Sequence, residues 1–233
     1  MSRREVHIPD GHTKGEEMTR VQYWLYGVVR QMIETFCRLY FRVEIHGREH
    51  IPRTGAFIVA PVHRSYLDTP LLGAMTRRRM RYMGAEKMWT NRALGWFLTA
   101  VGGFPVHRGS ADREALKAGL AVLERGEPLV MFPEGTRQEG PILHTLFDGP
   151  AYVSARSGAP ILPVGLGGTE AAMPKGKRFI RPVKMSIVIG EPIQPPPAKA
   201  SGSVPRSAVR ELTADLGTAI QGLFDEAQAI CGR

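Results

Sequence analysis

The chain has 233 residues, of which 43% are hydrophobic and 23% are charged. This composition is that of a globular protein and excludes intrinsic disorder and fibrous repeats. The 31 basic residues outnumber the 22 acidic ones, and the formal net charge of +9 indicates an anionic partner such as lipid head groups, nucleic acid or a phosphorylated ligand. The two cysteines, Cys37 and Cys231, indicate neither a disulfide framework nor a zinc cluster and fit a reducing compartment.

The N-terminal part of the chain divides into a tail and a helix. Residues 1–18 carry charges of both signs and lack the apolar stretch of a secretory signal, so we expect a flexible tail. Residues 19–41 predict an amphipathic helix of about 22 residues, because their large apolar side chains fall on one broad arc of a helical wheel. The members of this arc are Val21, Trp24, Leu25, Val28, Val29, Met32, Ile33, Phe36, Leu39 and Tyr40.

The apolar arc is open to two interpretations. Either the helix packs the arc against the core of the protein, or it lies in the plane of a membrane, for which its aromatic residues and flanking arginines are suited. No stretch of the sequence reaches the roughly 18 to 20 uninterrupted apolar residues that a transmembrane helix needs. We therefore expect a peripheral protein at the cytoplasmic face of the cell membrane, without a full transmembrane span.

Residues 42–233 are expected to form one domain in which strands and helices alternate. The clearest helix runs from Asp112 to Arg125 and is followed by Gly126 as a stop signal. The alternation predicts an α/β fold with a mostly parallel sheet of about seven strands flanked by helices. The predicted strands are Phe41 to Ile45, Ala56 to Ala60, Met80 to Gly84, Phe104 to His107, Pro128 to Phe132, Ile161 to Leu166 and Lys184 to Ile189.

Two further segments complete the organisation of the chain. A linker rich in proline, serine and glycine, from Glu191 to Pro205, precedes a last amphipathic helix that we expect to pack against the sheet. The apolar positions of this helix are Val209, Leu212, Leu216, Ile220 and Leu223.

The sequence also contains a run of basic residues, which we interpret either as a solvated face or as an anion-binding patch. It comprises Arg77, Arg78, Arg79 and Arg81.

A histidine and an aspartate follow one of the predicted strands. His63 and Asp68 come soon after the run that ends at Ala60, at the edge where open α/β sheets place their ligands. Five residues apart, they do not share a helix face, so they meet only if the chain turns between them and a helix begins near Asp68. The carboxylate then accepts the proton of one imidazole nitrogen and leaves the other nitrogen free as a base.

A second polar cluster follows another predicted strand. Glu134 and Arg137 lie in the stretch Phe-Pro-Glu-Gly-Thr-Arg, whose proline and glycine predict a tight turn at the same sheet edge as His63. Between the two clusters, Arg108 is a third candidate basic group. Arginine suits phosphate because its guanidinium forms a bidentate fork.

Together, these residues resemble the four sequence blocks of the glycerolipid acyltransferases, a family that includes the 1-acylglycerol-3-phosphate and glycerol-3-phosphate acyltransferases. The resemblance spans about residues 55 to 170, and the blocks follow one another in the family's order. The blocks are the HxxxxD box of His63 and Asp68, the segment from Phe104 to Arg108, the EGTR box from Glu134 to Arg137, and Ile161-Leu162-Pro163-Val164.

The resemblance implies an enzyme that moves a fatty acyl group from acyl-coenzyme A or acyl carrier protein to a hydroxyl of lysophosphatidate, giving phosphatidate. It implies that His63 is the general base and that Asp68 orients it. The residues implied for acceptor binding are Arg108, Glu134, Gly135, Thr136 and Arg137. Glycerol 3-phosphate or another lysophospholipid is the alternative acceptor. A thioester is already activated, so the implied chemistry calls for neither a metal nor a cofactor beyond the acyl donor. The expected macroscopic partner is an anionic membrane surface and not nucleic acid.

Two positions depart from the pattern of this family. Val62 stands where the family often has asparagine, and Asp148 stands where many members carry a lysine. The candidates for the missing cation are Arg64, Lys87 and Arg92.

A nearby apolar stretch belongs either to the core or to the floor of an acyl-chain tunnel. It comprises Trp89, Leu94, Trp96, Phe97, Leu98 and Val101.

Two other classes of function are weaker interpretations of the same residues. A hydrolase that uses Ser65 lacks a G-x-S-x-G elbow, and this serine is only two residues from His63. A basic module that binds nucleic acid or anionic membrane without catalysis rests on net charge alone, because aromatic residues are not interleaved with the arginines and no nucleic-acid-binding motif occurs.

Overall fold

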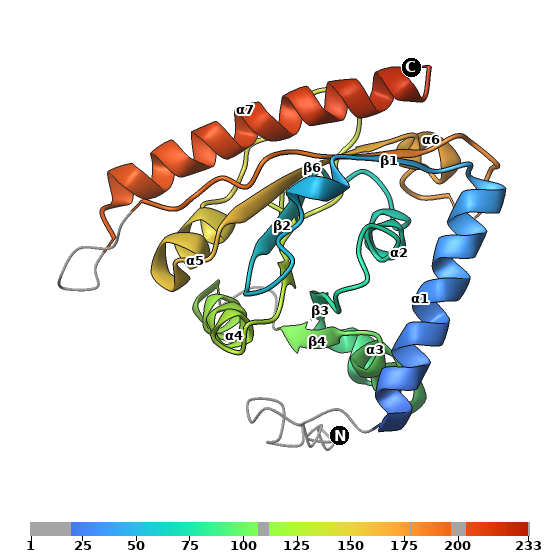
Figure 1. Cartoon of the computed structure of the whole chain (residues 1–233), viewed down its shortest axis with the longest axis horizontal. Coiled ribbons are helices and arrows are strands. Elements are labelled where there is room, and N and C mark those ends of the chain that lie inside the picture. Colours follow the sequence, from blue (N-terminus) through green and yellow to red (C-terminus); the bar gives the residue numbers. More distant parts are fainter. Residues whose placement is uncertain (1–19, 107–111, 178, 197–203, 233) are drawn as a thin grey trace, which may run out of the picture.

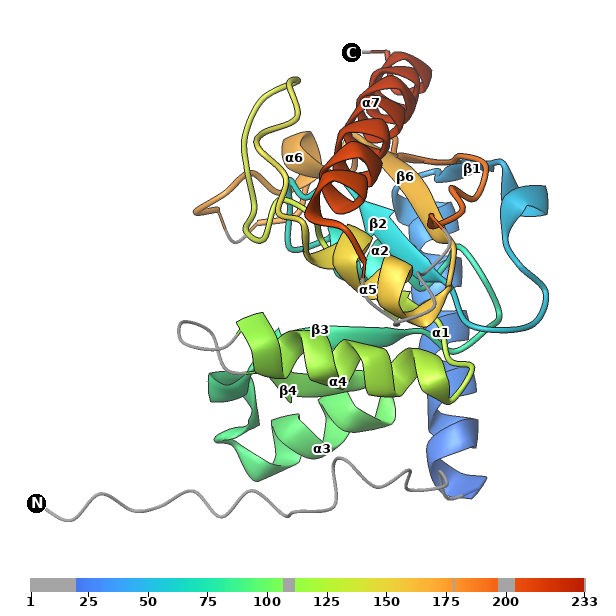
Figure 2. The same cartoon turned by 90° about the vertical axis from the view of Figure 1, so that its left-hand side faces the viewer.

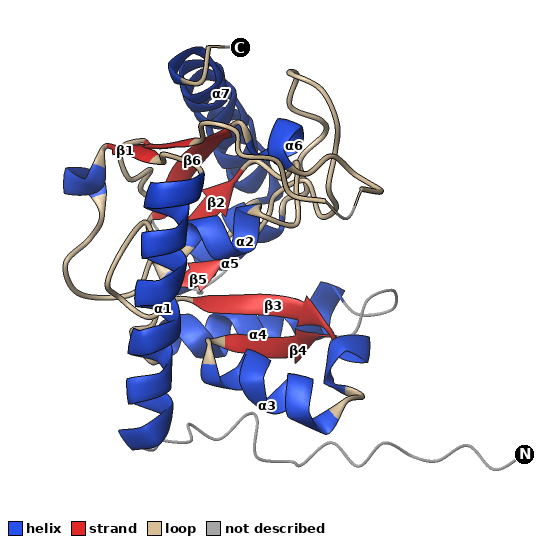
Figure 3. Cartoon of the chain, turned by 90° about the vertical axis from the view of Figure 1, so that its right-hand side faces the viewer, coloured by secondary structure: helices blue, strands red, loops and turns tan. Residues whose placement is uncertain are grey.

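The computed structural model describes residues 20–106, 112–177, 179–196 and 204–232. These residues form three layers, with one sheet between two sets of helices (Figure 1). Helices α4 (Asp112–Glu124), α5 (Gly149–Ser157) and α7 (Arg206–Ile230) cover one face of the sheet (Figure 2). Helices α1 (Arg20–Tyr40), α2 (Asp68–Leu72) and α3 (Arg92–Ala100) cover the other face (Figure 3).

The sheet has seven strands in the order β1-β7-β6-β2-β5-β3-β4. Only the β6–β7 pair is antiparallel among the strand pairs of the described chain, so the predicted α/β fold with a mostly parallel sheet is confirmed. The strands are β1 (Glu44–His46), β2 (Ile58–Pro61), β3 (Arg81–Ala85), β4 (Gly103–Val106), β5 (Leu129–Val130), β6 (Ile161–Gly167) and β7 (Ser186–Ile189). Three short helical segments lie outside the layers: η2 (Arg48–His50), η3 (Glu86–Trp89) and α6 (Thr169–Ala172).

The order of the central strands positions the site. β5 and β6 flank β2 and both run parallel to it, with Ile58 paired to Leu129 on one side and to Ile161 on the other. All four residues of β2 are buried. The segment after β2 carries His63 and the segment after β5 carries Glu134, so the carboxyl ends of two adjacent parallel strands bring both predicted clusters to one edge.

Helix α7 packs against β6 as predicted for the last amphipathic helix. Its buried residues are Val209, Leu212, Leu216, Ile220, Phe224 and Ala227, whereas the predicted Leu223 is only half-buried. The backbones approach so closely that a Cβ atom at Gly165 would lie 2.1 Å from the carbonyl oxygen of Leu223. Only glycine at this position allows the helix to lie directly on the strand.

Helix α1 turns its apolar arc largely away from the protein. Cys37 is buried on its inner side, and the Arg30–Glu34 ion pair also faces inward, with side chains that are 12% and 13% exposed. The exposed large apolar residues of this helix are Val21, Trp24, Met32, Phe36, Leu39 and Tyr40. Packing of α1 on the protein therefore uses a different side of the helix from most of the apolar arc. Within the described residues, no helix combines the length and the apolar character needed to cross a bilayer.

The basic run before β3 holds loops in place. The Arg78 guanidinium donates hydrogen bonds to the carbonyl groups of Pro52, Gly55 and Gly126. Arg79 donates to the carbonyl group of Thr99. These two arginines therefore bind the backbone of neighbouring loops and contribute to folding.

We expect the two thiols to differ strongly in reactivity. Burial, with a smaller contribution from Glu34, raises the pKa of the Cys37 thiol to about 11, while Cys231 is half-buried. Because the thiolate is the reactive form, Ellman's reagent at pH 8 should modify at most Cys231 rapidly in the native protein. A Cys231→Ser variant should show almost no reaction until denaturant is added. Rapid modification of Cys37 in that variant would mean that α1 separates from the sheet.

Candidate active site

His63 and Asp68 meet at the carboxyl end of β2. The chain turns after Arg64 and enters α2 at Asp68, and the backbone N–H of Asp68 donates to the carbonyl oxygen of Ser65. This turn places His63 Nδ1 2.8 Å from Asp68 Oδ2. The predicted contact is therefore present. Because the carboxylate accepts a hydrogen bond, Nδ1 carries the hydrogen and Nε2 presents a lone pair.

The Asp68 carboxylate is fixed before any substrate binds. Its side chain is fully buried, and Oδ2 also accepts hydrogen bonds of 2.7 Å from the backbone N–H groups of Arg64 and Ser65. Oδ1 is buried without a hydrogen-bond partner among the described residues. The two backbone donors hold the carboxylate in one orientation, and this orientation sets the direction of the imidazole.

The His63 ring is supported on its face and open at one nitrogen. It stacks on Phe132, with ring centroids 3.9 Å apart and an interplanar angle of 26°. Its side chain is 16% exposed, and Nε2 has no hydrogen-bond partner in the described ranges. The free nitrogen of a half-buried, oriented imidazole is the arrangement that a general base requires.

A buried ion pair connects the two loops of the site. Arg64 is 1% exposed, and its Nη1 donates to both carboxylate oxygens of Glu134 at 2.9 and 2.8 Å. Its other donors bind the carbonyl groups of Gly140 and Ile142, and its guanidinium lies 5.0 Å from the Phe224 ring centroid. Arg64 is therefore committed to the protein interior and does not supply the cation missing at position 148.

Glu134 positions the histidine through the backbone. Its Oε2 accepts the backbone N–H of His63 at 2.9 Å, and its Oε1 accepts that of His144 at 3.1 Å. The backbone N–H of Gln138 donates to the carbonyl oxygen of His63. Both backbone groups of His63 are thus held by residues of the loop after β5. Glu134 shapes the site through these contacts, since protein donors already engage its two oxygens.

The rest of the EGTR segment lies at the surface beside His63. Gly135 adopts a φ of +67°, and Phe147 lies so close that a Cβ atom would be 2.8 Å from its ring. Gly135 and Thr136 are exposed. The Arg137 guanidinium lies face-on to Tyr66, with its Cζ 3.4 Å from the ring centroid. No acidic side chain of the described chain pairs with Arg137.

Several other predicted residues do not join this cluster. Arg108 lies outside the described residues. Asp148 Oδ1 accepts a hydrogen bond from Thr213 of α7, so this side chain serves the packing of α5 and α7. Lys87 and Arg92 are exposed on η3 and α3. Ser65 is buried and donates its hydroxyl hydrogen to the carbonyl oxygen of Met173, which argues against a serine nucleophile.

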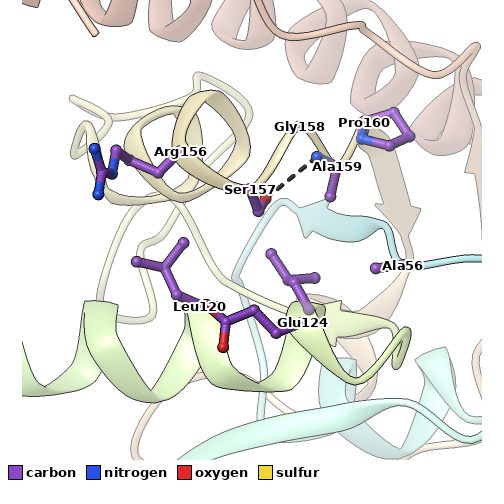
Figure 4. A pocket seen from close by; sticks show the side chains of 9 residues that line it. Ala56, Leu120, Glu124, Arg156, Ser157, Gly158, Ala159 and Pro160 are labelled. Atoms are coloured by element: carbon purple, nitrogen blue, oxygen red, sulfur yellow. Dashed lines mark hydrogen bonds between the residues drawn. The ribbon is translucent and has the colours of Figure 1, made fainter. Parts of the chain in front are cut away.

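One well-formed pocket lies away from this chemistry. A pocket of about 390 Å³ opens between the ends of α4 and α5 and the residues that precede β2 and β6 (Figure 4). Ala56 and Pro160 line it, so it lies at the opposite edge of the sheet from His63. In the described chain, no three His, Cys, Asp or Glu side chains come together as a metal site.

The fold and this arrangement are typical of an enzyme that uses an oriented histidine as a base at the carboxyl edge of an α/β sheet. A model of the Acyltransferase family matches residues 42–167, which include both clusters. The chain therefore belongs to the Acyltransferase family.

Individual relatives agree with this assignment. A 1-acyl-sn-glycerol-3-phosphate acyltransferase of Bacillus subtilis is 28% identical over 65% of this chain and 73% of the relative. A lyso-ornithine lipid O-acyltransferase of Pseudomonas aeruginosa is 34% identical over 54% of this chain and 47% of the relative. The chain spans about half the length of the relatives of Arabidopsis thaliana and Chlamydomonas reinhardtii, 49% and 48%.

A solved structure shares the fold over nearly the whole chain. The crystal structure of the 1-acyl-sn-glycerophosphate acyltransferase PlsC of Thermotoga maritima superposes with a TM-score of 0.68 at 25% identity. The match covers 90% of this chain and 84% of that one. It therefore extends beyond the segment that the family model matches.

Removal of one partner of the buried ion pair should destabilise the fold. Glu134→Gln leaves the Arg64 charge buried without a counterion, so the free energy of unfolding in urea should fall by roughly 3–5 kcal/mol. Glu139→Gln is the matched control, because the Lys175–Glu139 pair is 49% and 63% exposed and its loss should change stability by less than about 0.5 kcal/mol. Unchanged stability of Glu134→Gln, together with a raised acceptor KM, would instead assign Glu134 to substrate contact.

Proposed function

We propose that this protein transfers a fatty acyl group from a thioester donor, acyl-coenzyme A or acyl carrier protein, to the free hydroxyl of lysophosphatidate, giving phosphatidate. The observation that carries the proposal is the 2.8 Å contact between His63 Nδ1 and Asp68 Oδ2, which leaves Nε2 without a hydrogen-bond partner among the described residues. The acceptor named for the Bacillus relative supports the same substrate class.

In the proposed reaction, His63 first accepts a proton and later returns it. His63 Nε2 takes the proton of the acceptor hydroxyl while the oxygen attacks the thioester carbonyl carbon. The buried Asp68 carboxylate stabilises the imidazolium that forms. When the tetrahedral intermediate collapses, the carbon–sulfur bond breaks and the thiolate takes the proton back from Nε2. The products are the new ester and the free thiol, and His63 is restored.

The acceptor's anionic head would bind at the EGTR segment. Arg137 supplies a guanidinium whose charge is not neutralised by an acid of the described chain, and the exposed Gly135 and Thr136 line its loop. Arg108 remains a second proposed phosphate ligand. Glycerol 3-phosphate and other lysophospholipids are alternative acceptors, and the Pseudomonas relative adds lyso-ornithine lipid to the acceptors to be tested.

The catalytic assignment has a direct test. Purified protein is incubated with palmitoyl-coenzyme A or palmitoyl-acyl carrier protein and each acceptor, and products are identified by mass. Lysophosphatidate should be the preferred acceptor, His63→Ala should abolish transfer, and Asp68→Asn should lower kcat by about 10² or more, because it misorients the base.

The controls separate catalysis from folding and binding. Both variants should keep the wild-type circular dichroism spectrum and liposome binding, as expected if these residues act in chemistry. Near-normal turnover of Asp68→Asn would make Asp68 structural. An inactive wild-type protein that still binds anionic liposomes would favour the non-catalytic basic module.

We also propose that the outer side of α1 rests on the cytoplasmic face of a membrane. This side exposes Trp24 (69%), Met32 (67%) and Leu39 (78%), whereas the ion pair of the helix faces the protein. An apolar stripe of this kind is unfavourable in water and favourable at the boundary between head groups and acyl chains. Tyr40 donates a hydrogen bond to the carbonyl of Ile180, so the neighbouring exposed Phe179 and Ile180 extend the stripe.

Charge placed on this stripe should weaken membrane binding. A Trp24→Glu/Met32→Glu variant should sediment far less with liposomes that contain anionic lipid, because two carboxylates would have to enter the apolar boundary. A Thr218→Glu/Ser207→Glu variant adds the same charge to exposed positions of α7, on the other face of the sheet, and should bind like wild type. Equal loss in both variants would indicate an effect of net charge and would refute the stripe as the contact.

A further inference from the structure

Tyr66 and Arg137 form a contact that the proposed mechanism does not use. Tyr66 belongs to the loop after β2 and is 61% exposed. The Arg137 Cζ lies 3.4 Å from its ring centroid, which is van der Waals contact between the face of the guanidinium and the face of the ring. Tyr66, which lies between His63 and Asp68, thus contacts Arg137 of the EGTR box.

We propose that Tyr66 is a positioning residue of the acceptor site: its ring is the platform on which Arg137 is held flat, with its N–H donors directed to the anion of the acceptor's head group. This inference rests on the proposed function, in which Arg137 binds that anion. It assigns to the fourth residue of the His63–Asp68 box a role that neither base catalysis nor packing of the core requires.

The geometry of a stacked guanidinium favours this role. All five N–H donors of arginine lie in the plane of the guanidinium, so a ring stacked on one face leaves every donor available to a bidentate anion. The attraction between the cation and the ring restrains a side chain that otherwise has many rotamers. Less conformational entropy is then lost when the anion binds.

The backbone fixes the same arrangement relative to the base. Glu134 and Gln138, on either side of Arg137, hold the N–H and the C=O of His63. Tyr66 follows on the same loop, whose Ser65 hydroxyl and N–H are engaged by Met173 and Asp68. Tyr66, Arg137 and His63 therefore belong to two loops that hydrogen bonds join into one unit.

The experiment measures steady-state kinetics in mixed micelles, with lysophosphatidate and palmitoyl-coenzyme A as substrates. Tyr66→Leu should raise the acceptor KM about two- to five-fold, the effect of one exposed cation–π contact, and should leave kcat and the donor KM unchanged. Tyr66→Phe keeps the ring and should behave as wild type. Tyr152→Leu is the matched control, since its ring makes no cation contact within the described residues. Thermal unfolding confirms that each variant is folded.

A double variant separates a platform from a direct lipid contact. Arg137→Ala alone should raise the acceptor KM more than Tyr66→Leu does. In the Arg137→Ala background, Tyr66→Leu should have no further effect, because the ring acts only through the guanidinium. An equal increase of KM in both backgrounds would mean that Tyr66 touches the lipid itself and would overturn the platform.

The remaining outcomes distinguish this inference from the proposed function. If Arg137→Ala raises the acceptor KM and Tyr66→Leu does not, the platform is wrong and the proposed function stands. If Arg137→Ala leaves the acceptor KM unchanged while wild type acylates lysophosphatidate, the anion binds elsewhere. The anion-binding role of Arg137 and the positioning role of Tyr66 are then both wrong. If wild type acylates no acceptor, the proposed function itself is wrong.

Discussion

The buried ion pair between Arg64 and Glu134 is the interaction on which the geometry of the site depends. It joins the loop after β2 to the loop after β5, two segments that adjacent parallel strands bring to the same edge. Both side chains lie inside the protein, so neither charge is tolerated there without the other. Because Glu134 also holds the N–H of His63, this buried charge pair sets the position of the His63 backbone.

The sequence was sufficient for the features that follow from periodicity and strand order. The seven strands and the meeting of His63 with Asp68 depend on alternating runs and on the shared carboxyl edge of parallel strands, which are local or topological signals. The burial of Arg64 was not predictable in this way. His63 and Arg64 are adjacent basic residues, and the sequence alone does not show which of the two side chains points into the protein. Its burial depends on Glu134, Gly140 and Phe224, all distant in the chain, and no spacing rule identifies them.

Helix α1 shows why amphipathic periodicity alone does not identify the inner side of a helix. The helical wheel locates the apolar arc correctly, but it does not say which medium the arc faces. In the folded protein, Cys37 and the Arg30–Glu34 pair occupy the inner side, and the tryptophan and several large aliphatic and aromatic residues remain outside. A helix can bury an ion pair against protein and expose an apolar stripe without penalty only where that stripe meets another apolar medium. Most of the arc therefore does not pack against the core, and the helix contacts the protein mainly through its other side.

The departure at position 148 has a structural consequence for the acceptor site. Asp148 is bound to Thr213 of α7, so the position at which the family resemblance implies a lysine belongs here to helix packing. On the proposed function, recognition of the acceptor's anion then depends more heavily on arginine. A lysine is a flexible point charge, whereas a guanidinium held flat on an aromatic ring presents donors in a fixed plane. If Tyr66 restrains Arg137 as proposed, the head group of the acceptor must match the orientation of Arg137 as well as its charge.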